Sequence, residues 1–312
     1  MSDFEAILEA YERSGGDPAF LKSSQVASLV ISGDQVLGLN AVPGLDVDPQ
    51  PLPDGVQVTV VVEPQVQIEN PVHLCFGVVP EEGVQRILVD FRIGEGASVQ
   101  FTAHCTFPNA VDVEHLMEGT IHVGAGATMR YEETHYHGET GGVHVVPVAQ
   151  VTVDEGARYV STFNQRQGRA GRLEFDYEVD VDANAVAELN ARAMGYDDDE
   201  ITIKETIRLN GQGARGVAKS RLALRDHAHG NVFGTTEGNA PFTRGHVDCV
   251  EIVRDDAEAE AVPVVRVSDH RAQVTHEAAI GTVNKKELET LMTRGLDEEE
   301  AVDVIVQGML EA

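Results

Sequence analysis

Tryptophan is absent from this chain of 312 residues, and cysteine occurs only at Cys75, Cys105 and Cys249. Without tryptophan, no aromatic platform for bases or sugars stands out. Three cysteines with no C-x-x-C pair do not form a disulfide framework, and they suit a reducing compartment. No run of about 18 apolar residues is present to span a bilayer. The acidic start MSDFEAILEAYERS lacks the basic residues of a secretory signal, so we expect a cytoplasmic protein.

Basic residues are scarce, with 23 Lys and Arg against 52 Asp and Glu and a formal net charge of -29. A surface this negative repels phosphate backbones, which argues against nucleic-acid binding. A proteome adapted to high internal salt has the same bias, so the acidity itself indicates no function. The dipeptide Gly-Lys does not occur, which rules out the phosphate-binding loop G-x-x-x-x-G-K-[ST]. If ATP is used in this system, another subunit must bind it.

Strand patterns dominate from about Val56 to Val274. Runs rich in Val, Ile and Thr alternate with polar residues, as in VQVTVVVEP, RILVDFRI and HVVPVAQVTV. β-Branched residues suit a pleated, partly buried surface, and small-residue turns separate the runs. This part of the chain is therefore predicted to be mostly β.

The turns recur at a nearly constant spacing. Intervals of 30, 30, 28, 29 and 26 residues separate the turn alanines, which are Ala97, Ala127, Ala157, Ala185, Ala214 and Ala240. Such a repeat is typical of coils that stack and bury one continuous core. We predict a right-handed parallel β-helix. A sandwich built from repeated hairpins is the alternative fold.

Helical patterns flank this core. At the N-terminus, Ser2 is a candidate cap, Gly15-Gly16 ends the pattern, and the apolar face consists of Phe4, Ile7, Leu8 and Tyr11. After Val283, two short amphipathic patterns follow, which either cap the end of the solenoid or form a docking surface. The predicted division is a helix and connecting segment at 1–55, the β-helix core at 56–283 and a helical segment at 284–312.

Two histidine pairs have the spacing of neighbours on one face of a strand. They are His135 with His137 and His227 with His229. Such pairs can bind a metal through imidazole nitrogen atoms. A histidine ladder on a polar face is the alternative interpretation.

Cys249 lies in the strand-like segment RGHVDCVEIV, and His276-Glu277 follow about one repeat later. In a solenoid, residues one period apart are stacked neighbours, so this thiol can lie beside the imidazole and the carboxylate. Iron accepts all three donor types. A buried, inert cysteine beside a polar turn is the alternative.

Two segments resemble the SufB/SufD family of iron–sulfur cluster assembly proteins. QVTHEAAIGTVNKKELETLMTRGLDEEEAVDVIVQGML resembles the carboxy-terminal signature of that family, and HCTFPNAVDVEHLMEGTIHV resembles its G-C-T-x-P segment. The resemblance implies a parallel β-helix, a two-fold dimer and a separate SufC-like ABC-type ATPase docked on the C-terminal helices. It also implies a scaffold that is not itself an enzyme, that holds a transient iron–sulfur cluster and that serves recipient apoproteins.

The resemblance also assigns residues. Cys249, Glu277 and His276 match the cluster ligands at the dimer interface. Cys105 matches a cysteine that accepts sulfur, and His115 matches a histidine on the same interior route. The chain is compact, as in an archaeal-type scaffold that forms a homodimer, and His104 replaces the glycine of G-C-T-x-P. The alternatives are a SufD-like structural partner without a cluster and a β-helix enzyme acting on polysaccharides.

Overall fold

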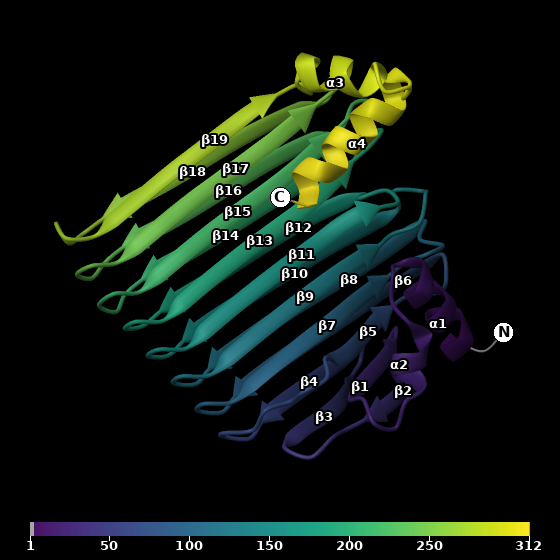
Figure 1. Cartoon of the computed structure of the whole chain (residues 1–312). Helices are drawn as coiled ribbons and strands as arrows, with labels where there is room; N and C mark the ends of the chain where they lie inside the picture. Colours follow the sequence, from purple (N-terminus) through teal and green to yellow (C-terminus); the bar gives the residue numbers. More distant parts are fainter. Residues whose placement is uncertain (1–2, 312) are drawn as a thin grey trace.

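The computed structural model describes residues 3–311, and it is mostly β, with short helices near both termini. Two sheets face each other and form a solenoid of about eight turns (Figure 1). The prediction of a parallel β-helix is thereby confirmed, and the sandwich is excluded. No helix within residues 3–311 combines the length and the hydropathy that crossing a bilayer requires.

One sheet contains all three cysteines and is called the cysteine sheet below. Its strands are β1 (Ser28–Ser32), β2 (Gln35–Asn40), β5 (Val72–Gly77), β7 (Ser98–Thr106), β9 (Thr128–Tyr136), β11 (Arg158–Gln167), β13 (Val186–Gly195), β15 (Arg215–Leu224), β17 (Arg244–Val253) and β19 (Gln273–Gly281). The opposite sheet contains β3 (Leu45–Leu52), β4 (Gly55–Val62), β6 (Glu82–Ile93), β8 (Asp112–Val123), β10 (Val143–Val153), β12 (Arg172–Val181), β14 (Glu200–Leu209), β16 (His229–Gly238) and β18 (Glu258–Val267).

Each coil contributes one strand to each sheet, and equivalent residues of successive coils are hydrogen-bonded neighbours. The N–H of Arg215 donates to the carbonyl of Ala185, and the N–H of Arg244 donates to the carbonyl of Ala214. Thr243, and not Ala240, therefore follows Ala214 at this corner. The prediction that Ala240 is the turn residue of this coil is therefore wrong. The equivalent corner position is occupied by a threonine, which a search for turn alanines does not find. Phe242 adopts a φ of 61° at the position that glycine fills in most other coils.

The core lies between the two sheets and runs along the whole solenoid. Strand residues alternate between the interior and the exterior, as in the pattern of β12, so each interior position forms a column of stacked side chains. Large buried members include Phe91, Phe101, Phe163 and Phe175. Burial of one such side chain contributes about 1.5–3 kcal/mol, which stabilises coils that could not fold singly.

The first coil is built from two antiparallel strand pairs, and α1 (Asp3–Arg13) and α2 (Pro18–Lys22) lie beside it. Ile7, Leu8 and Tyr11 pack against Val30 and Cys75 on the outer face of the cysteine sheet. Strands thus begin at Ser28, inside the segment expected to be a connection, and the boundary at residue 56 stays a prediction. The proposed cap Ser2 lies outside the described residues.

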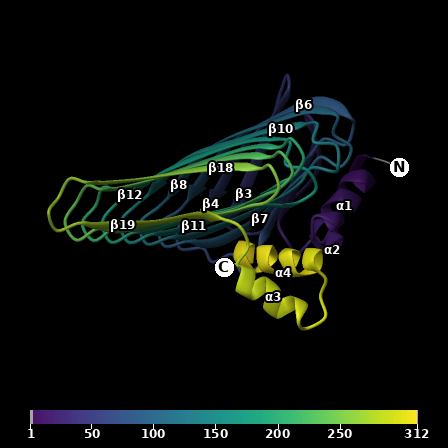
Figure 2. The same ribbon diagram turned by 90° about the horizontal axis from the view of Figure 1, so that it is seen from above.

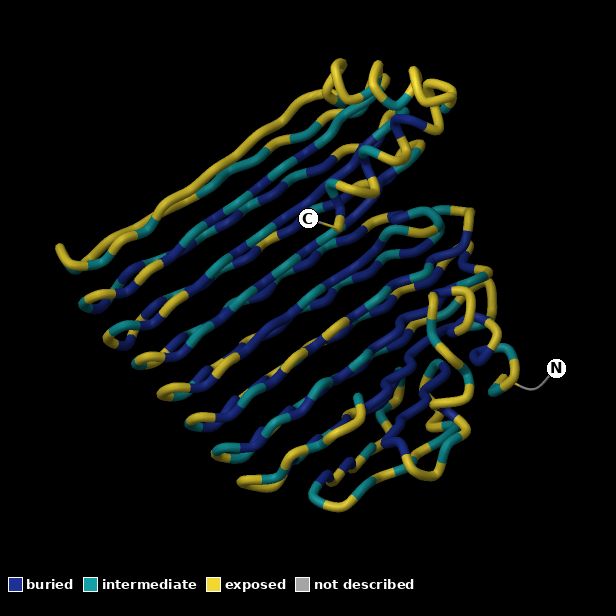
Figure 3. The backbone as a smooth tube through the Cα atoms, in the orientation of Figure 1, coloured by how far each residue is buried: buried dark blue, intermediate teal, exposed yellow. Residues whose placement is uncertain are grey.

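The last coil is left open. Helix α3 (Lys285–Met292) and helix α4 (Glu298–Glu311) lie beside the solenoid and do not cover its end (Figures 1 and 2). Val302, Val306 and Leu310 of α4 pack on Met194 and Ala223, outside the cysteine sheet. By contrast, β18 and β19 are exposed along most of their length (Figure 3).

Candidate functional site

Two neighbouring interior columns of the cysteine sheet hold Cys105 and Cys249. The first column is Phe76, Cys105, His135, Gln165, Ala193, Leu222, Glu251 and Ile280. The second column is Leu74, Ala103, Glu133, Phe163, Ala191, Ser220, Cys249 and Ala278. Five strand spacings of about 4.8 Å separate the two thiols, which is roughly 24 Å along the solenoid.

Cys105, Glu133 and His135 form a cluster in the interior of the N-terminal coils, called the interior cluster below. One ligand atom of each residue lies within 4.8 Å of the others. The thiol of Cys105 donates to Glu133 Oε1 at 3.6 Å, and His135 Nε2 lies 2.6 Å from the same oxygen. All three residues are buried. Burial and the nearby Glu133 carboxylate raise the pKa of the Cys105 thiol well above its usual value.

Two further histidines adjoin this cluster. His137 Nε2 lies 3.0 Å from His135 Nδ1, and His137 Nδ1 lies 3.0 Å from the carbonyl oxygen of Ala170. His115 reaches the interior from the opposite sheet, with its ring centroid 6.1 Å from that of His135. Neither nitrogen of His115 has a hydrogen-bond partner within the described residues. Burial lowers the pKa of His137 to about 3 and holds that of His115 well below its usual value.

A second polar group surrounds Cys249 near the open end. Ser220 precedes Cys249 in the column, and its hydroxyl donates to Glu205 Oε2 at 2.8 Å. Burial, and then the carboxyl groups of Glu251 and Glu205, raise the pKa of Cys249 to about 12, so its thiol is protonated in the isolated chain. Gly234 on the opposite sheet leaves room for Val247, two residues before Cys249, because a Cβ at Gly234 would lie 2.5 Å from Val247 Cγ1.

The structure does not gather Cys249, His276 and Glu277 within one chain. The register places His276 beside Val247, Glu277 beside Asp248 and Ala278 beside Cys249. His276 therefore shares the interior face with Cys249, whereas Glu277 lies on the outer face of β19. Within residues 3–311, Cys105, Glu133 and His135 form the one group of three His, Cys, Asp or Glu side chains whose ligand atoms all lie within 4.8 Å of one another. The ligand set at Cys249 stays a prediction.

The remaining predicted residues have plainer surroundings. Cys75 is buried beneath α1, and all three cysteines are free. His227 and His229 are exposed and lie near acidic residues of the next coil. His135 and His137, the other pair, belong to the interior of the solenoid. The signal for Glu133 was present in the sequence MRYEETHYHG, because Glu133 alternates in phase with Met129, Tyr131 and His135.

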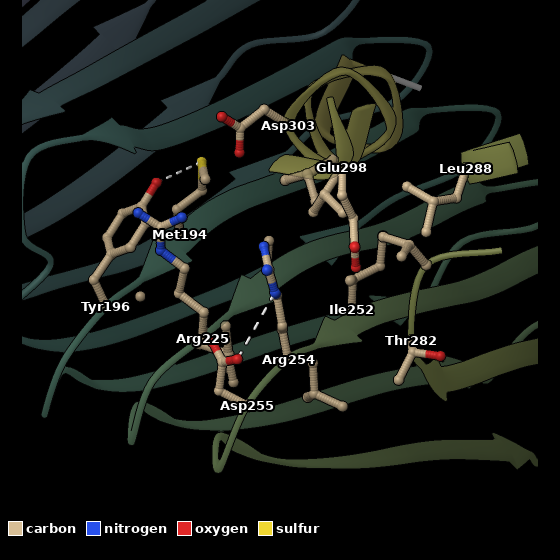
Figure 4. Close-up of a pocket in the computed structure, with 17 residues that line it drawn as sticks. Met194, Tyr196, Arg225, Ile252, Arg254, Asp255, Thr282, Leu288, Glu298 and Asp303 are labelled. Carbon is tan, nitrogen blue, oxygen red and sulfur yellow. Dashed lines mark hydrogen bonds and ion pairs between the residues drawn. The ribbon is translucent and has the colours of Figure 1, made fainter. Parts of the chain in front are cut away.

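A pocket of about 230 Å³ lies where α3 and α4 meet the solenoid. Met194, Ile252 and Leu288 provide apolar walls, and Arg225 stacks over the ring of Tyr196 at 4.4 Å (Figure 4). Figure 4 also shows Glu298 and Asp303 of α4 at its rim. This pocket contains no cysteine or histidine, and it is separate from both interior groups.

The fold and these side chains define a β-solenoid protein that carries cysteine, histidine and glutamate side chains inside its coils. Residues 81–309 match the family model for the SufBD core domain of SUF system iron–sulfur cluster assembly. The chain is 35% identical to an iron-sulfur cluster assembly SufBD family protein of Methanocaldococcus jannaschii, over 97% of this chain and 96% of the relative. It is 34% identical to one from Pyrococcus horikoshii, over 99% of this chain and 94% of that relative.

A second relative from Pyrococcus horikoshii is 28% identical, and the match covers 80% of this chain and 56% of the longer protein. These matches show that the chain belongs to the SufBD family of iron–sulfur cluster assembly proteins. The resemblance noted in the two sequence segments is thereby confirmed. The compact length is shared with the two relatives that match over nearly their whole length.

Proposed function

We propose that this protein is a scaffold on which a nascent iron–sulfur cluster is built or held, at an interface between two copies of the chain. The observation that carries the proposal is the position of Cys249, one coil inside an uncovered end of a SufBD solenoid. The cluster is cargo that passes to recipient apoproteins. The family membership favours this function over a polysaccharide-active enzyme, and the protein itself acts as a scaffold without catalysing a reaction.

The open end supports the proposal of a homodimer. Its interior positions include Val265, Val267 and Ile280, whose side chains are 38%, 48% and 47% exposed. The outer edges of β18 and β19 also have no strand partner among the described residues. Solenoids need a cap, and unpaired edges recruit other strands. A second copy placed by a two-fold axis covers both features with identical surfaces.

The cluster ligands in this proposal are Cys249, His276 and Glu277. Thiolate sulfur, imidazole nitrogen and carboxylate oxygen all bind iron, and a mixed set binds less tightly than four thiolates, which suits a cluster that must leave. His276 occupies an interior position of β19, and it is exposed because no further coil covers this strand. Cys249 must lose its proton when iron binds, because its pKa in the isolated chain is about 12.

Anaerobic reconstitution with iron and sulfide tests the ligand assignment. We expect the wild-type chain to develop iron–sulfur absorbance and Cys249→Ser to lose it without a change in fold. Cys75→Ser is the matched control, because Cys75 is also a buried thiol but lies beneath α1 at the N-terminal end. An unchanged spectrum of Cys249→Ser would falsify the assignment. A wild-type chain that binds no iron indicates instead a SufD-like structural partner.

Size-exclusion chromatography with light scattering tests the interface. We expect a dimer for the wild-type chain and a monomer for Val267→Asp, since an uncompensated carboxylate would be buried between the copies. Val84→Asp is the control, because Val84 is similarly exposed but lies on β6, far from the open end. A monomeric wild-type chain contradicts the proposed interface.

Two further parts of the proposal concern partners and sulfur. We propose that a SufC-like ABC-type ATPase docks on α3 and α4, where Met292 and Val304 are exposed. Cys105 is the proposed sulfur acceptor, and His115 lies on the same interior route. Because Cys105 is wholly buried, a sulfur donor reaches it only when the coils open. Free cysteines suit the cytoplasm as the location of these steps.

A further inference from the structure

The interior cluster has the donor set and the enclosure of a metal site, and it lies far from the open end. We propose that Cys105 Sγ, a carboxylate oxygen of Glu133 and His135 Nε2 bind one divalent transition-metal ion, Zn²⁺ or Fe²⁺. His115 is the candidate for a fourth ligand from the opposite sheet: its ring centroid lies 6.1 Å from that of His135, and its ring must move toward the cluster, because His115 is not part of the group whose ligand atoms lie within 4.8 Å of one another. The bound ion then links the two sheets through the core of the solenoid.

Two of the distances between the donors are close to those of a tetrahedral site. With metal–sulfur bonds of about 2.3 Å and metal–oxygen or metal–nitrogen bonds of about 2.0–2.1 Å, ligand atoms lie roughly 3.3–3.6 Å apart. Cys105 Sγ and Glu133 Oε1 are already 3.6 Å apart. His135 Nε2 and the same oxygen are 2.6 Å apart, so they must separate by less than about 1 Å to admit the ion.

The hydrogen bonds of His137 determine which nitrogen of His135 faces the site. The carbonyl of Ala170 only accepts, so His137 Nδ1 carries the proton that it donates there. His137 Nε2 then accepts the proton of His135 Nδ1, which leaves the lone pair of His135 on Nε2. A ligand histidine held through its other nitrogen is the usual arrangement at metal sites.

The same assignment explains the close approach of His135 Nε2 to Glu133. A bare nitrogen and a carboxylate oxygen repel each other, so a proton lies between them at 2.6 Å when no ion is bound. A metal ion replaces that proton and the thiol proton of Cys105, and both leave as H⁺. No redox step is involved.

His115 is the independent observation that points to a ligand. Its ring is completely buried, and neither of its nitrogen atoms has a partner within the described residues. A buried polar group without a partner is costly and rare. Glu133 accepts hydrogen bonds from the Cys105 thiol and from the Tyr177 hydroxyl, but within residues 3–311 its only ion-pair partner is His135 and it has no Lys or Arg partner. A divalent cation would give His115 a partner and balance the charge of the Glu133 carboxylate.

Sulfur, nitrogen and oxygen donors together select the metal class. A thiolate with imidazole and carboxylate suits Zn²⁺ or Fe²⁺, whereas Ca²⁺ and Mg²⁺ prefer oxygen ligands alone. The site does not depend on the proposed scaffold function. It does use the sulfur of Cys105, so an occupied site and a sulfur-accepting Cys105 exclude each other on one chain.

Cobalt loading tests this site, because tetrahedral Co²⁺ reports thiolate ligation through visible and charge-transfer bands. The full chain is produced in cells supplied with Co²⁺, treated with a chelator to strip surface ions and analysed for metal. We expect about one Co²⁺ per chain with a thiolate band. Cys105→Ser removes the band, and Glu133→Gln and His115→Gln lower the retained metal.

Cys75→Ser and Cys249→Ser are the matched controls and should retain cobalt like the wild-type chain. If Cys105→Ser fails to fold, the two Gln variants carry the test: Glu133→Gln preserves side-chain shape, His115→Gln keeps a polar side chain of similar length, and the fold of both is checked by circular dichroism. The proposal is overturned if the stripped wild-type chain holds no cobalt, or if its band depends on Cys249 and persists without Cys105. The same Cys249→Ser variant separates the two sites. It should fail to form the iron–sulfur cluster in the reconstitution experiment, yet retain as much cobalt as the wild-type chain.

Discussion

Glu205 offers the sharpest physical test of the interior of the solenoid. It lies on β14, faces the core with 1% exposure and accepts the hydroxyl hydrogen of Ser220 through Oε2. Its other oxygen has no partner within the described residues. Burial raises the pKa of Glu205 to about 8, and the Ser220 hydrogen bond and the nearby Arg221 only partly oppose the shift. Glu205 also lies close enough to Cys249 to raise the pKa of the Cys249 thiol.

The raised pKa has a definite consequence for stability. The ordinary value is 4.5 and the folded value about 8, so the folded chain holds a proton that the unfolded chain loses between these pH values. The associated stability is fully present below pH 4.5 and is lost as the pH rises to about 8. The slope is about 1.4 kcal/mol per pH unit, which amounts to roughly 2–3 kcal/mol between about pH 5.5 and 7.5.

Glu205→Gln removes this titration and keeps an acceptor for Ser220. We therefore expect the free energy of unfolding of the wild-type chain to fall relative to the variant by roughly 2–3 kcal/mol across that interval. Urea denaturation of both proteins at several pH values measures the difference, and the shared titration of Glu251 and the surface carboxylates largely cancels. Glu200→Gln, on the exposed start of the same strand, is the control. A wild-type minus variant difference that is independent of pH would refute the reasoning.

Three more outcomes are expected in thermal or chemical denaturation. Arg169→Ala should destabilise the fold by about 3 kcal/mol, because Arg169 Nε donates to the wholly buried Asp199 at 2.9 Å. Arg158→Ala is the control: it breaks an exposed ion pair with Glu188 and should cost less than about 1 kcal/mol. Equal losses would contradict the burial argument. Phe163→Ala should cost about 3–5 kcal/mol, since its ring packs on Phe175 in the core, and a smaller loss would mean that the coils collapse around the cavity. Raising KCl from about 0.1 to 1 M should raise the Tm, because the shorter Debye length, about 3 Å instead of 10 Å, screens the repulsion within a chain of net charge -29. A Tm that falls with added KCl would contradict this expectation.

The period of the turns was the strongest signal in the sequence. A spacing of 28 to 30 residues predicted stacked coils correctly, because parallel strands in a solenoid must repeat at the length of one coil. The Ala240 turn misled only because Thr243 fills the corner there. The three strands between Ser28 and Leu52 were missed. The proline-rich sequence of β3 is also typical of a connection, whereas the apolar run SLVIS of β1 is a strand signal that the prediction did not use.

The interior polar groups could be predicted only in part. Alternation within a strand places Glu133 with His135 and Cys249 with Glu251, and both pairs can be read from the sequence. That Ser220 donates to Glu205 from the other sheet depends on how the two sheets face each other, which no local pattern encodes. The single-residue register at β19 likewise separates Glu277 from Cys249, although the sequence places the two one repeat apart.

By itself, the sequence determined the coil length, the identity of the interior side chains and the membership of the SufBD family, because these depend on spacing and on residue type. Tertiary structure alone decided that Cys105, Glu133 and His135 meet in a closed interior, that α4 lies beside the solenoid and that the last coil stays open. The reason is physical: strand alternation is local, whereas register between coils and contact between sheets depend on how the whole core packs.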